Sequence, residues 1–443
     1  MNSFKKVSIT ILTILFLSSI SFAQLQERVL VGYWENWDNN FVEINDLDSR
    51  YNVIVLAFLE ADVNNVADDN LVSDIEWEPW NSSGYTNGNI KTDIKSKQAE
   101  GKTVLISIGG GNGSFKLNSE EDKNTFVSKV EDFISEYEVD GIDLDIEKDI
   151  YMCFGQQSMT SPATSLQYLI DGTKEIMNWY RNEYGKKMIL TSAPEVRYVT
   201  GGLAPWHECY GTYLPFIEQM SDSLDLLMVQ YYNSGSIYSI PGWPNANTEY
   251  HEGTVDFVIV NTEAVIEGFI SKNSKVTGTY SGLPASKVVI SLPSCGDAAS
   301  LSAENLKSAA NYIMGRGEKP GNYTLSNSYP DFRGFMTWSA SHDAKKCNYS
   351  YADAFSNTFD SIISRNEFSS INSLNIYPNP SEGFISINSK KIIGKKLELI
   401  DLGGQIILST IIKEKLTNIK LDNISSGLYT IQVGGYVTKL VVK

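Results

Sequence analysis

Histidine is scarce in this chain of 443 residues. Its three histidines are His207, His251 and His342, and no two of them stand four positions apart. A helical zinc site of the common kind needs that spacing, because residues i and i+4 share one face of a helix. The sequence therefore excludes such a site, and we expect no metal ion and no other cofactor.

Cysteine and positive charge are also in short supply. Four cysteines are too few to build a disulfide-based scaffold in a chain of this length. The 36 basic residues are outnumbered by 53 acidic ones, which gives a formal net charge of −17 at pH 7. Because such a surface repels phosphate groups, we expect neither nucleic acid nor an anionic membrane as the main partner.

Long hydrophobic runs are absent except near the N-terminus. There, Lys5 and Lys6 precede an apolar run at 7–16, and the small residues Ser21 and Ala23 follow. This order is typical of a signal peptide cleaved after Ala23. A membrane anchor is the alternative, but the run is shorter than the ~20 residues that span a bilayer. We predict a signal peptide at 1–23 and a secreted protein, extracellular or on the cell surface, that is monomeric and not stably inserted in a membrane.

Short apolar runs rich in β-branched residues recur along the middle of the chain, with amphipathic helical patterns between many of them. The eight runs are 29–33, 53–58, 103–108, 141–146, 188–193, 224–231, 287–292 and 334–338. Alternating strands and helices predict a parallel sheet covered by helices. Eight such units predict an α/β fold, a (β/α)8 TIM barrel over 24–368. A doubly wound open sheet is the alternative.

The C-terminal region has a different composition. Residues 370–443 contain nine lysines, five acidic residues and no tryptophan. Seven short strand-like runs are separated there by turn signals such as Pro378-Asn379-Pro380 and Gly434-Gly435. This pattern predicts a small all-β sandwich domain over 369–443.

The most informative stretch runs from Asp140 to Glu147 and reads Asp-Gly-Ile-Asp-Leu-Asp-Ile-Glu. Strand alternation places Asp143, Asp145 and Glu147 on one face. In a barrel the end of this strand lies at the rim where active sites are built. Repulsion and desolvation there would keep a proton on the cluster, which supplies a general acid. A solvated acidic face and a metal site of oxygen ligands are the alternatives.

The stretch matches every fixed position of Asp-Gly-x-Asp-x-Asp-x-Glu, the catalytic signature of the family 18 glycoside hydrolases, the chitinase family. Over about 28–365 the chain resembles that family, because further matching segments occur in the same order. These segments are Gly32-Tyr33-Trp34, Ser107-Ile108-Gly109-Gly110, Leu190-Thr191-Ser192-Ala193-Pro194-Glu195, Gln230-Tyr231-Tyr232-Asn233 and Gly334-Phe335-Met336-Thr337-Trp338-Ser339. Many relatives have Met-x-Tyr-Asp at the fourth segment, and the form found here is similar to that of plant and bacterial single-domain chitinases.

The resemblance implies a retaining mechanism in which the substrate's own N-acetyl oxygen is the nucleophile. It implies that Glu147 is the general acid/base and that Asp145 accepts a hydrogen bond from the acetamido N–H. Asp143 would share a proton with Asp145, and Tyr232 would donate its hydroxyl to the acetamido carbonyl.

Chitin or chitooligosaccharides are the substrates that the resemblance implies. Trp338 would form the floor under the sugar, although Trp338, Tyr33 and Phe58 also suit a plain barrel core. The substrate-binding candidates are Tyr33, Phe58, Gly109, Gly110, Ala193, Gln230, Asn233 and Trp338.

The four cysteines follow four different strands of the expected barrel. Neighbouring barrel loops favour the pairs Cys153–Cys209 and Cys295–Cys347, with free thiols as the alternative.

The tail resembles the C-terminal sorting domain of type IX secretion in the Bacteroidetes. The residues that carry this likeness are Ile376-Tyr377-Pro378-Asn379-Pro380, Gly427-Leu428-Tyr429 and Lys439-Leu440-Val441-Val442-Lys443. It implies the type IX secretion machinery as a partner. A carbohydrate-binding module is the alternative, but such modules usually need exposed aromatic residues and the tail has no tryptophan.

Three functions fit these observations. The first is a secreted chitinase that cleaves β-1,4 bonds between N-acetylglucosamine units. The second is an endo-β-N-acetylglucosaminidase acting on the chitobiose core of N-glycans. The third is a non-catalytic chitin-binding lectin, which would be expected to have lost the acid, whereas Glu147 is present.

Overall fold

The computed structural model describes residues 25–37, 41–61, 71–73, 84–205, 207–233, 250–369, 375–381, 383–388, 393–401, 405–421, 424–433 and 436–443. The expected signal peptide at 1–23 lies outside these residues. The chain divides into two compact units between Phe355 and Ser356. The expected domain boundary at 368/369 stays a prediction.

The first unit is built on eight parallel strands, which confirms the predicted barrel. They are β1 (Val29–Trp34), β2 (Val53–Ala61), β4 (Thr103–Gly109), β5 (Gly141–Asp145), β7 (Ile189–Ser192), β8 (Leu226–Leu227), β12 (Val289–Pro293) and β13 (Gly334–Trp338). Their order is β12-β13-β1-β2-β4-β5-β7-β8. Parallel bridges from Leu227 to Val288 and from Gln230 to Ser291 connect the β8 end of this order to the β12 end, and they close the barrel. The alternative of an open doubly wound sheet is therefore wrong.

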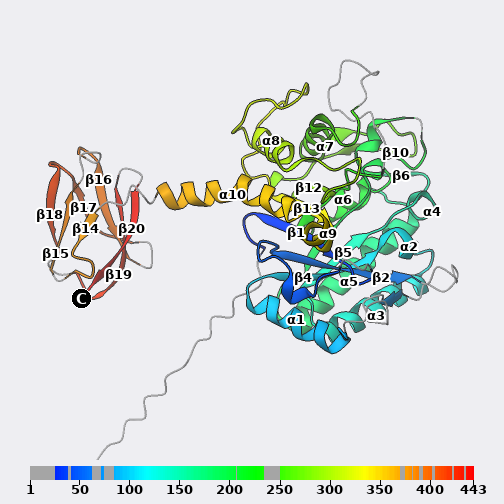
Figure 1. The fold of residues 1–443 in the computed structure, drawn as a ribbon, viewed down its shortest axis with the longest axis horizontal. Helices are drawn as coiled ribbons and strands as arrows, with labels where there is room; N and C mark the ends of the chain where they lie inside the picture. The colour runs from blue at the N-terminus through cyan, green and yellow to red at the C-terminus, as the bar shows by residue number, and fades with distance from the viewer. Residues whose placement is uncertain are drawn as a thin grey trace, which may run out of the picture. The chain divides into compact units, whose positions relative to one another are not determined.

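Helices surround these strands (Figure 1). The longer ones are α1 (Asn87–Ala99), α3 (Glu120–Tyr137), α5 (Thr164–Tyr184), α7 (Val255–Glu267) and α8 (Ala303–Ile313), whereas α10 (Ser350–Ser369) begins in the first unit and continues past Phe355. The shorter ones are α2 (Gly110–Gly113), α4 (Asp149–Met152), α6 (Leu214–Met220) and α9 (Ala340–Lys346). Four 3-10 turns are η1 (Ile44–Asp46), η2 (Val196–Tyr198), η3 (Thr200–Leu203) and η4 (Ala285–Lys287).

Short strands complete this unit. They are β3 (Leu71–Ser73), β6 (Gln157–Ser158), β9 (Phe269–Ile270), β10 (Val276–Thr277) and β11 (Thr279–Tyr280). β3 pairs antiparallel with β2, β6 pairs parallel with β10, and β9 pairs antiparallel with β11.

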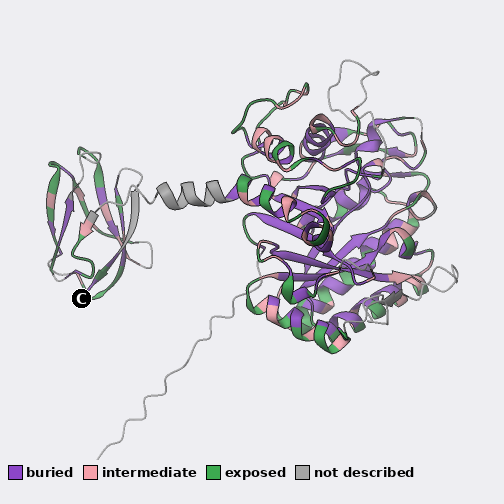
Figure 2. Ribbon diagram, in the orientation of Figure 1, coloured by how far each residue is buried: buried purple, intermediate pink, exposed green. Residues whose placement is uncertain are grey.

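Local sequence explains where the long helices begin and end. The side chain of Ser119 accepts from the backbone N–H of Asp122, whose side chain accepts from Ser119 in return, and this capping box starts α3. Gly185, with φ +66°, ends α5, because glycine adopts a left-handed conformation without strain. The apolar face of each helix is buried against the barrel, as the burial colours show (Figure 2).

The second unit contains two antiparallel sheets, which confirms the predicted all-β domain. One holds β14 (Asn375–Tyr377), β15 (Phe384–Asn388) and β18 (Leu416–Lys420). The other holds β17 (Ile406–Ile411), β16 (Lys396–Ile400), β19 (Gly427–Val433) and β20 (Tyr436–Val442). Residues of both sheets, such as Ile387, Leu399 and Ile431, share one buried core.

A search for membrane spans among the described residues finds no helix with the length and apolar character to cross a bilayer.

Candidate active site

Asp143 lies inside the barrel and is fully buried. Tyr33 Oη and Ser107 Oγ each donate to its Oδ2 at 2.6 Å, and Thr191 Oγ1 donates to its Oδ1 at 2.6 Å. These residues come from β1, β4 and β7, so the barrel itself assembles the contacts. Burial raises the pKa of Asp143, and the three hydrogen bonds oppose that shift.

Gln230 connects the other two carboxylates of the strand. Its Nε2 atom lies 2.7 Å from Asp145 Oδ1, 3.0 Å from Glu147 Oε1 and 2.9 Å from the Ala193 carbonyl oxygen. An amide nitrogen has two hydrogens, so these three oxygens share two donors. Gln230 therefore fixes the two carboxyl groups relative to each other.

The environment of Asp145 and Glu147 favours their protonated forms. Burial raises the pKa of both groups, and the negative charges of Glu147 and then Asp143 raise the pKa of Asp145 further. At Glu147 the hydrogen bond from Gln230 opposes the shift. The pair therefore keeps a proton at a pH where ordinary carboxyl groups have lost theirs, which is the property required of a general acid.

A cavity of about 380 Å³ opens beside these carboxylates. Its lining combines aromatic rings, carboxyl groups and amides, namely Trp37, Phe58, Glu60, Gly111, Asn112, Asp145, Glu147, Tyr232, Asn233 and Trp338. Tyr232 is nearly buried, and burial together with the charges of Asp145 and Glu147 raises its pKa well above the usual value. Its hydroxyl therefore keeps its proton and can act as a hydrogen-bond donor.

Three aromatic rings pack together on one wall of the cavity. The rings of Phe58 and Trp338 are stacked with centroids 5.6 Å apart and an angle of 7° between their planes. Trp37 packs against both, with centroids 6.0 Å from each. Flat apolar surfaces of this kind suit the C–H faces of a pyranose ring.

Six of the predicted residues lie behind the cavity wall. Asp143, Tyr33, Gln230 and Ala193 hold the carboxylates through the contacts given above. Gly109 and Gly110 have φ values of +113° and +77°. A Cβ atom at Gly109 would lie 2.3 Å from the Asp145 carbonyl oxygen, and one at Gly110 would lie 2.6 Å from the Phe58 ring. These two glycines therefore make room for the residues that line the cavity.

Asp140, the first residue of the signature, lies away from the cavity. Its Oδ2 accepts from the backbone N–H of Val104 at 3.0 Å, and Lys186 Nζ lies 3.0 Å from its Oδ1. Both contacts are at the N-terminal end of the strands, so Asp140 stabilises the barrel there.

Four lining residues are absent from the predicted site residues, namely Trp37, Glu60, Gly111 and Asn112. Glu60 stands two positions after Phe58 on β2, so strand alternation could have placed it on the same side. Asn112 lies within a glycine-rich segment that follows β4. Trp37 follows β1 in a loop whose path no local pattern predicts.

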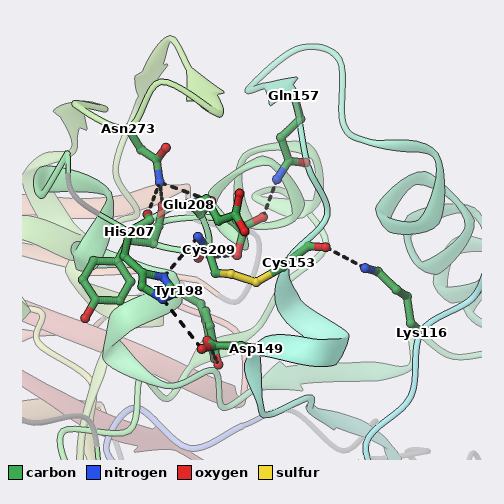
Figure 3. The surroundings of a disulfide bond; sticks show 11 residues. Lys116, Asp149, Cys153, Gln157, Tyr198, His207, Glu208, Cys209 and Asn273 are labelled. Carbon is green, nitrogen blue, oxygen red and sulfur yellow. Dashed lines mark hydrogen bonds and ion pairs between the residues drawn. A yellow bond between two sulfur atoms is a disulfide. The ribbon is translucent and has the colours of Figure 1, made fainter.

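The segment after Glu147 is attached to the segment after β7 (Figure 3). A disulfide joins Cys153 to Cys209, and Lys116 Nζ donates to the Cys153 carbonyl oxygen at 2.6 Å. Tyr198 Oη donates to Asp149 Oδ1 at 2.9 Å. A second disulfide joins Cys295 to Cys347. Both pairs are those that the order of the barrel loops favours.

Comparison with known families agrees with this geometry. The model of the glycosyl hydrolases family 18 matches residues 29–376. The chain belongs to this family. The model of the secretion system C-terminal sorting domain matches residues 375–443, so the family 18 barrel is followed by a sorting domain.

Two curated relatives show how much of the chain is shared. Chitinase Chi52 of Paenibacillus xylanexedens is 32% identical over 325 residues, which cover 71% of this chain and 58% of that protein. Chitinase ChiA of Flavobacterium johnsoniae is 32% identical over 353 residues, which cover 75% of this chain and 21% of that protein. The chain thus spans well under two thirds of the length of either relative.

A solved structure shares the fold. The family 18 chitinase of Chromobacterium violaceum aligns with a TM-score of 0.63 at 29% sequence identity, covering 75% of this chain and 83% of that one.

Proposed function

We propose that this protein is a secreted chitinase that hydrolyses β-1,4 bonds between N-acetylglucosamine units with retention of configuration. The observation that carries the proposal is the convergence of Asp145, Glu147 and Tyr232 on one cavity that also has a stacked aromatic wall. Membership of family 18 and the similarity to two proteins named as chitinases support chitin or chitooligosaccharides as the substrate.

In the first step Glu147 donates its proton to the glycosidic oxygen. The acetamido carbonyl oxygen of the substrate attacks C1 as the bond to the leaving sugar breaks, and an oxazolinium ring forms. Tyr232 donates its hydroxyl hydrogen to that carbonyl oxygen and holds it near C1. Asp145 accepts a hydrogen bond from the acetamido N–H, and its negative charge stabilises the positive charge that develops in the transition state.

In the second step Glu147 accepts a proton from water. The water oxygen attacks C1 on the face that the leaving sugar vacated, and the ring opens to restore the acetamido group. Two displacements at C1 give net retention. Phe58 and Trp338 contribute by stacking on the apolar face of the sugar and by excluding water from it.

We further propose export. The signal peptide expected at 1–23 would direct the chain across the inner membrane, and the C-terminal sorting domain would engage the type IX secretion machinery. The mature protein would then act outside the cell or at its surface as a monomer.

Replacement of Glu147 by Gln tests the catalytic proposal. The variant keeps the shape of the side chain and loses the transferable proton, so turnover of chitin oligomers should fall by at least ~10²-fold while binding survives. Glu121→Gln makes the same change at an exposed position of α3 and should retain full activity. Hydrolysis rates and calorimetric binding to the same oligomers provide the measurements.

Three further outcomes would contradict the proposal. Full activity of Glu147→Gln would remove the acid from the scheme. A first product with inverted anomeric configuration, seen by NMR, would exclude retention. Cleavage of a high-mannose glycoprotein in place of chitin oligomers would identify an endo-β-N-acetylglucosaminidase instead.

A further inference from the structure

Two residues with positive φ directly follow two groups of the proposed catalytic set. Lys148 follows Glu147 and has φ +66° with ψ 140°. Asn233 follows Tyr232 and has φ +57°. L-residues rarely adopt positive φ, and asparagine does so more readily than lysine, so the conformation of Lys148 in particular persists only where surrounding contacts hold it. Each of these turns sets the direction in which the preceding side chain enters the cavity.

A single ion pair contacts both turns. The backbone N–H of Lys148 lies 3.4 Å from Glu195 Oε1, at the long end of hydrogen bonding. Arg197 Nη2 donates to the Asn233 carbonyl oxygen at 2.7 Å. Arg197 Nε lies 2.7 Å from Glu195 Oε2, which makes an ion pair by distance, although the two groups are not aligned for a hydrogen bond. Glu195 and Arg197 therefore form one continuous connection between the segment that carries the acid and the segment that carries the tyrosine.

The backbone of the same segment also holds Gln230. The Gln230 N–H donates to the Pro194 carbonyl oxygen at 2.9 Å, and the Val196 N–H donates to the Gln230 carbonyl oxygen at 3.2 Å. The Gln230 side chain in turn contacts Asp145 and Glu147. The segment around Glu195 is further fixed by Tyr198, which donates to Asp149 in α4 (Figure 3).

Burial makes this ion pair effective. The Glu195 side chain is 10% exposed and the Arg197 side chain is 27% exposed. A pair that is largely removed from water is screened less than a surface pair, and the planar guanidinium can contact two acceptors at once. A lysine has one terminal nitrogen and cannot reproduce that geometry.

We propose that the Glu195–Arg197 ion pair positions the proposed catalytic groups, with Glu195 holding the turn after Glu147 and Arg197 holding the turn after Tyr232. Arg197 and Glu195 are positioning residues, because they act through the two turns rather than on the sugar. The inference rests on the proposed function and assigns to this pair the alignment of acid and tyrosine at one reacting sugar.

The pair also affects the protonation of Glu147. The positive charges of Lys148 and Arg197 lower the pKa of Glu147, which opposes the larger effect of burial. Burial raises the pKa of Glu195, the positive charge of Arg197 opposes that shift, and repulsion by the charge of Glu147 adds to it. The titratable groups that interact with Glu147 are Asp145, Lys148, Glu195, Arg197 and Tyr232.

Arg197→Met, Arg197→Lys and Glu195→Gln, with Arg50→Met as the control, test the inference in the full chain on chitin oligomers. Arg197→Met removes the charge and both contacts, so kcat should fall about 10-fold with KM changed less than about 3-fold, since alignment matters most in the transition state. Arg197→Lys retains the charge but loses the planar guanidinium that contacts two acceptors, and its kcat should fall by a similar factor. Arg50→Met breaks another arginine ion pair, with Asp48 at 2.8 Å before β2, and should leave kcat unchanged.

The pH dependence of kcat/KM separates positioning from a general loss of structure. The alkaline limb reports the deprotonation of the acid. It should move to higher pH in Arg197→Met, because a positive charge near Glu147 is lost. It should move to lower pH in Glu195→Gln, because a negative charge is lost, and it should stay in place in Arg197→Lys.

The outcomes separate this inference from the proposed function. If the wild type is active and Arg197→Met has the same kcat and the same alkaline limb, the inference is wrong while the proposed function stands. The inference would also be wrong if Arg197→Lys had a lower melting temperature but an unchanged kcat per folded molecule. The ion pair would then stabilise the fold without positioning the catalytic groups. A wild type inactive on chitin oligomers would overturn both.

Discussion

Asp143, Asp145 and Glu147 alternate along one strand and its extension, yet each has its own surroundings. Asp143 receives three hydroxyl hydrogen bonds. Asp145 is affected by the charges of Glu147, Asp143 and Glu195 and accepts a hydrogen bond from the Gln230 amide, and Glu147 reaches the cavity. Similar side chains therefore hold protons to different extents, and the proton that the Asp145–Glu147 pair retains is shared between two neighbouring carboxyl groups.

Asp145 should lower the stability of the folded protein at neutral pH. Its pKa in the folded state is well above the ordinary value, mainly because of burial, so the folded state binds its proton more tightly than the unfolded state. The resulting loss of stability is absent below the unfolded pKa and grows as pH rises toward the folded pKa. Asp145→Asn should therefore raise the melting temperature at pH 7 by about 2 °C or more, and by less at pH 4.

Thermal unfolding at the two pH values checks this expectation. Asp132→Asn removes a carboxyl group from an exposed position of α3 and serves as the control, with little change at either pH. A melting temperature of Asp145→Asn below that of the wild type at pH 7 would contradict the argument.

At the scale of elements, the segments after β5 and β7 form one support for the cavity. The Cys153–Cys209 disulfide joins the end of α4 to the loop that follows η3, because Cys153 directly follows Met152, the last residue of α4. The Glu195–Arg197 pair lies earlier in the connection that follows β7. The other disulfide, Cys295–Cys347, joins the segments after β12 and β13. Each disulfide thus joins the segments that follow two barrel strands, and the two disulfides differ in which segments they join.

Removal of the two disulfides should have distinguishable effects. They close loops of similar length, with sequence separations of 56 and 52 residues, so each should contribute a similar stabilisation of about 2–4 kcal/mol. The double variant Cys153→Ser/Cys209→Ser should also lower kcat, because the turn after Glu147 loses a support. Cys295→Ser/Cys347→Ser is the matched control for loop closure. Equal losses of kcat in the two double variants would contradict this assignment.

At the scale of the whole molecule, two units with separate hydrophobic cores have separate roles. The barrel interior holds one cluster of buried residues and the C-terminal sheets hold another. The cavity and every contact described around it belong to the barrel unit. Hydrolysis is therefore proposed for the first unit and export for the second.

Deletion of 375–443 should separate the two roles in a host with a type IX secretion system. The truncated protein should remain inside the cells, because the matched sorting domain is gone, and cell extracts should still hydrolyse chitin oligomers. Fractionation followed by immunoblotting and activity assays provides the measurement. Full-length Glu147→Gln should be exported normally without activity, which shows that export does not depend on hydrolysis. Export of the truncated chain at the wild-type level would refute the proposed route.

The sequence alone determined the kind of each domain and the core of the site. The eight strands, the capping box at Ser119 and the placement of Asp143, Asp145 and Glu147 depend on residues close in the chain, so local periodicity predicts them. The predicted strand at 224–231 was too long, because β8 pairs in the sheet only at Leu226–Leu227 and its later residues form single bridges.

Which side chains meet at the site depends on how the distant segments of the chain fold together. Tyr33 and Asp143 are 110 positions apart, and Gln230 and Asp145 are 85 apart, so no local pattern indicates their contacts. The same holds for Trp37 on the aromatic wall and for Arg197, which reaches Asn233 across 36 positions. Closure of the barrel brings the ends of all its strands to one rim, and the path of each loop above that rim then selects the residues that line or support the cavity.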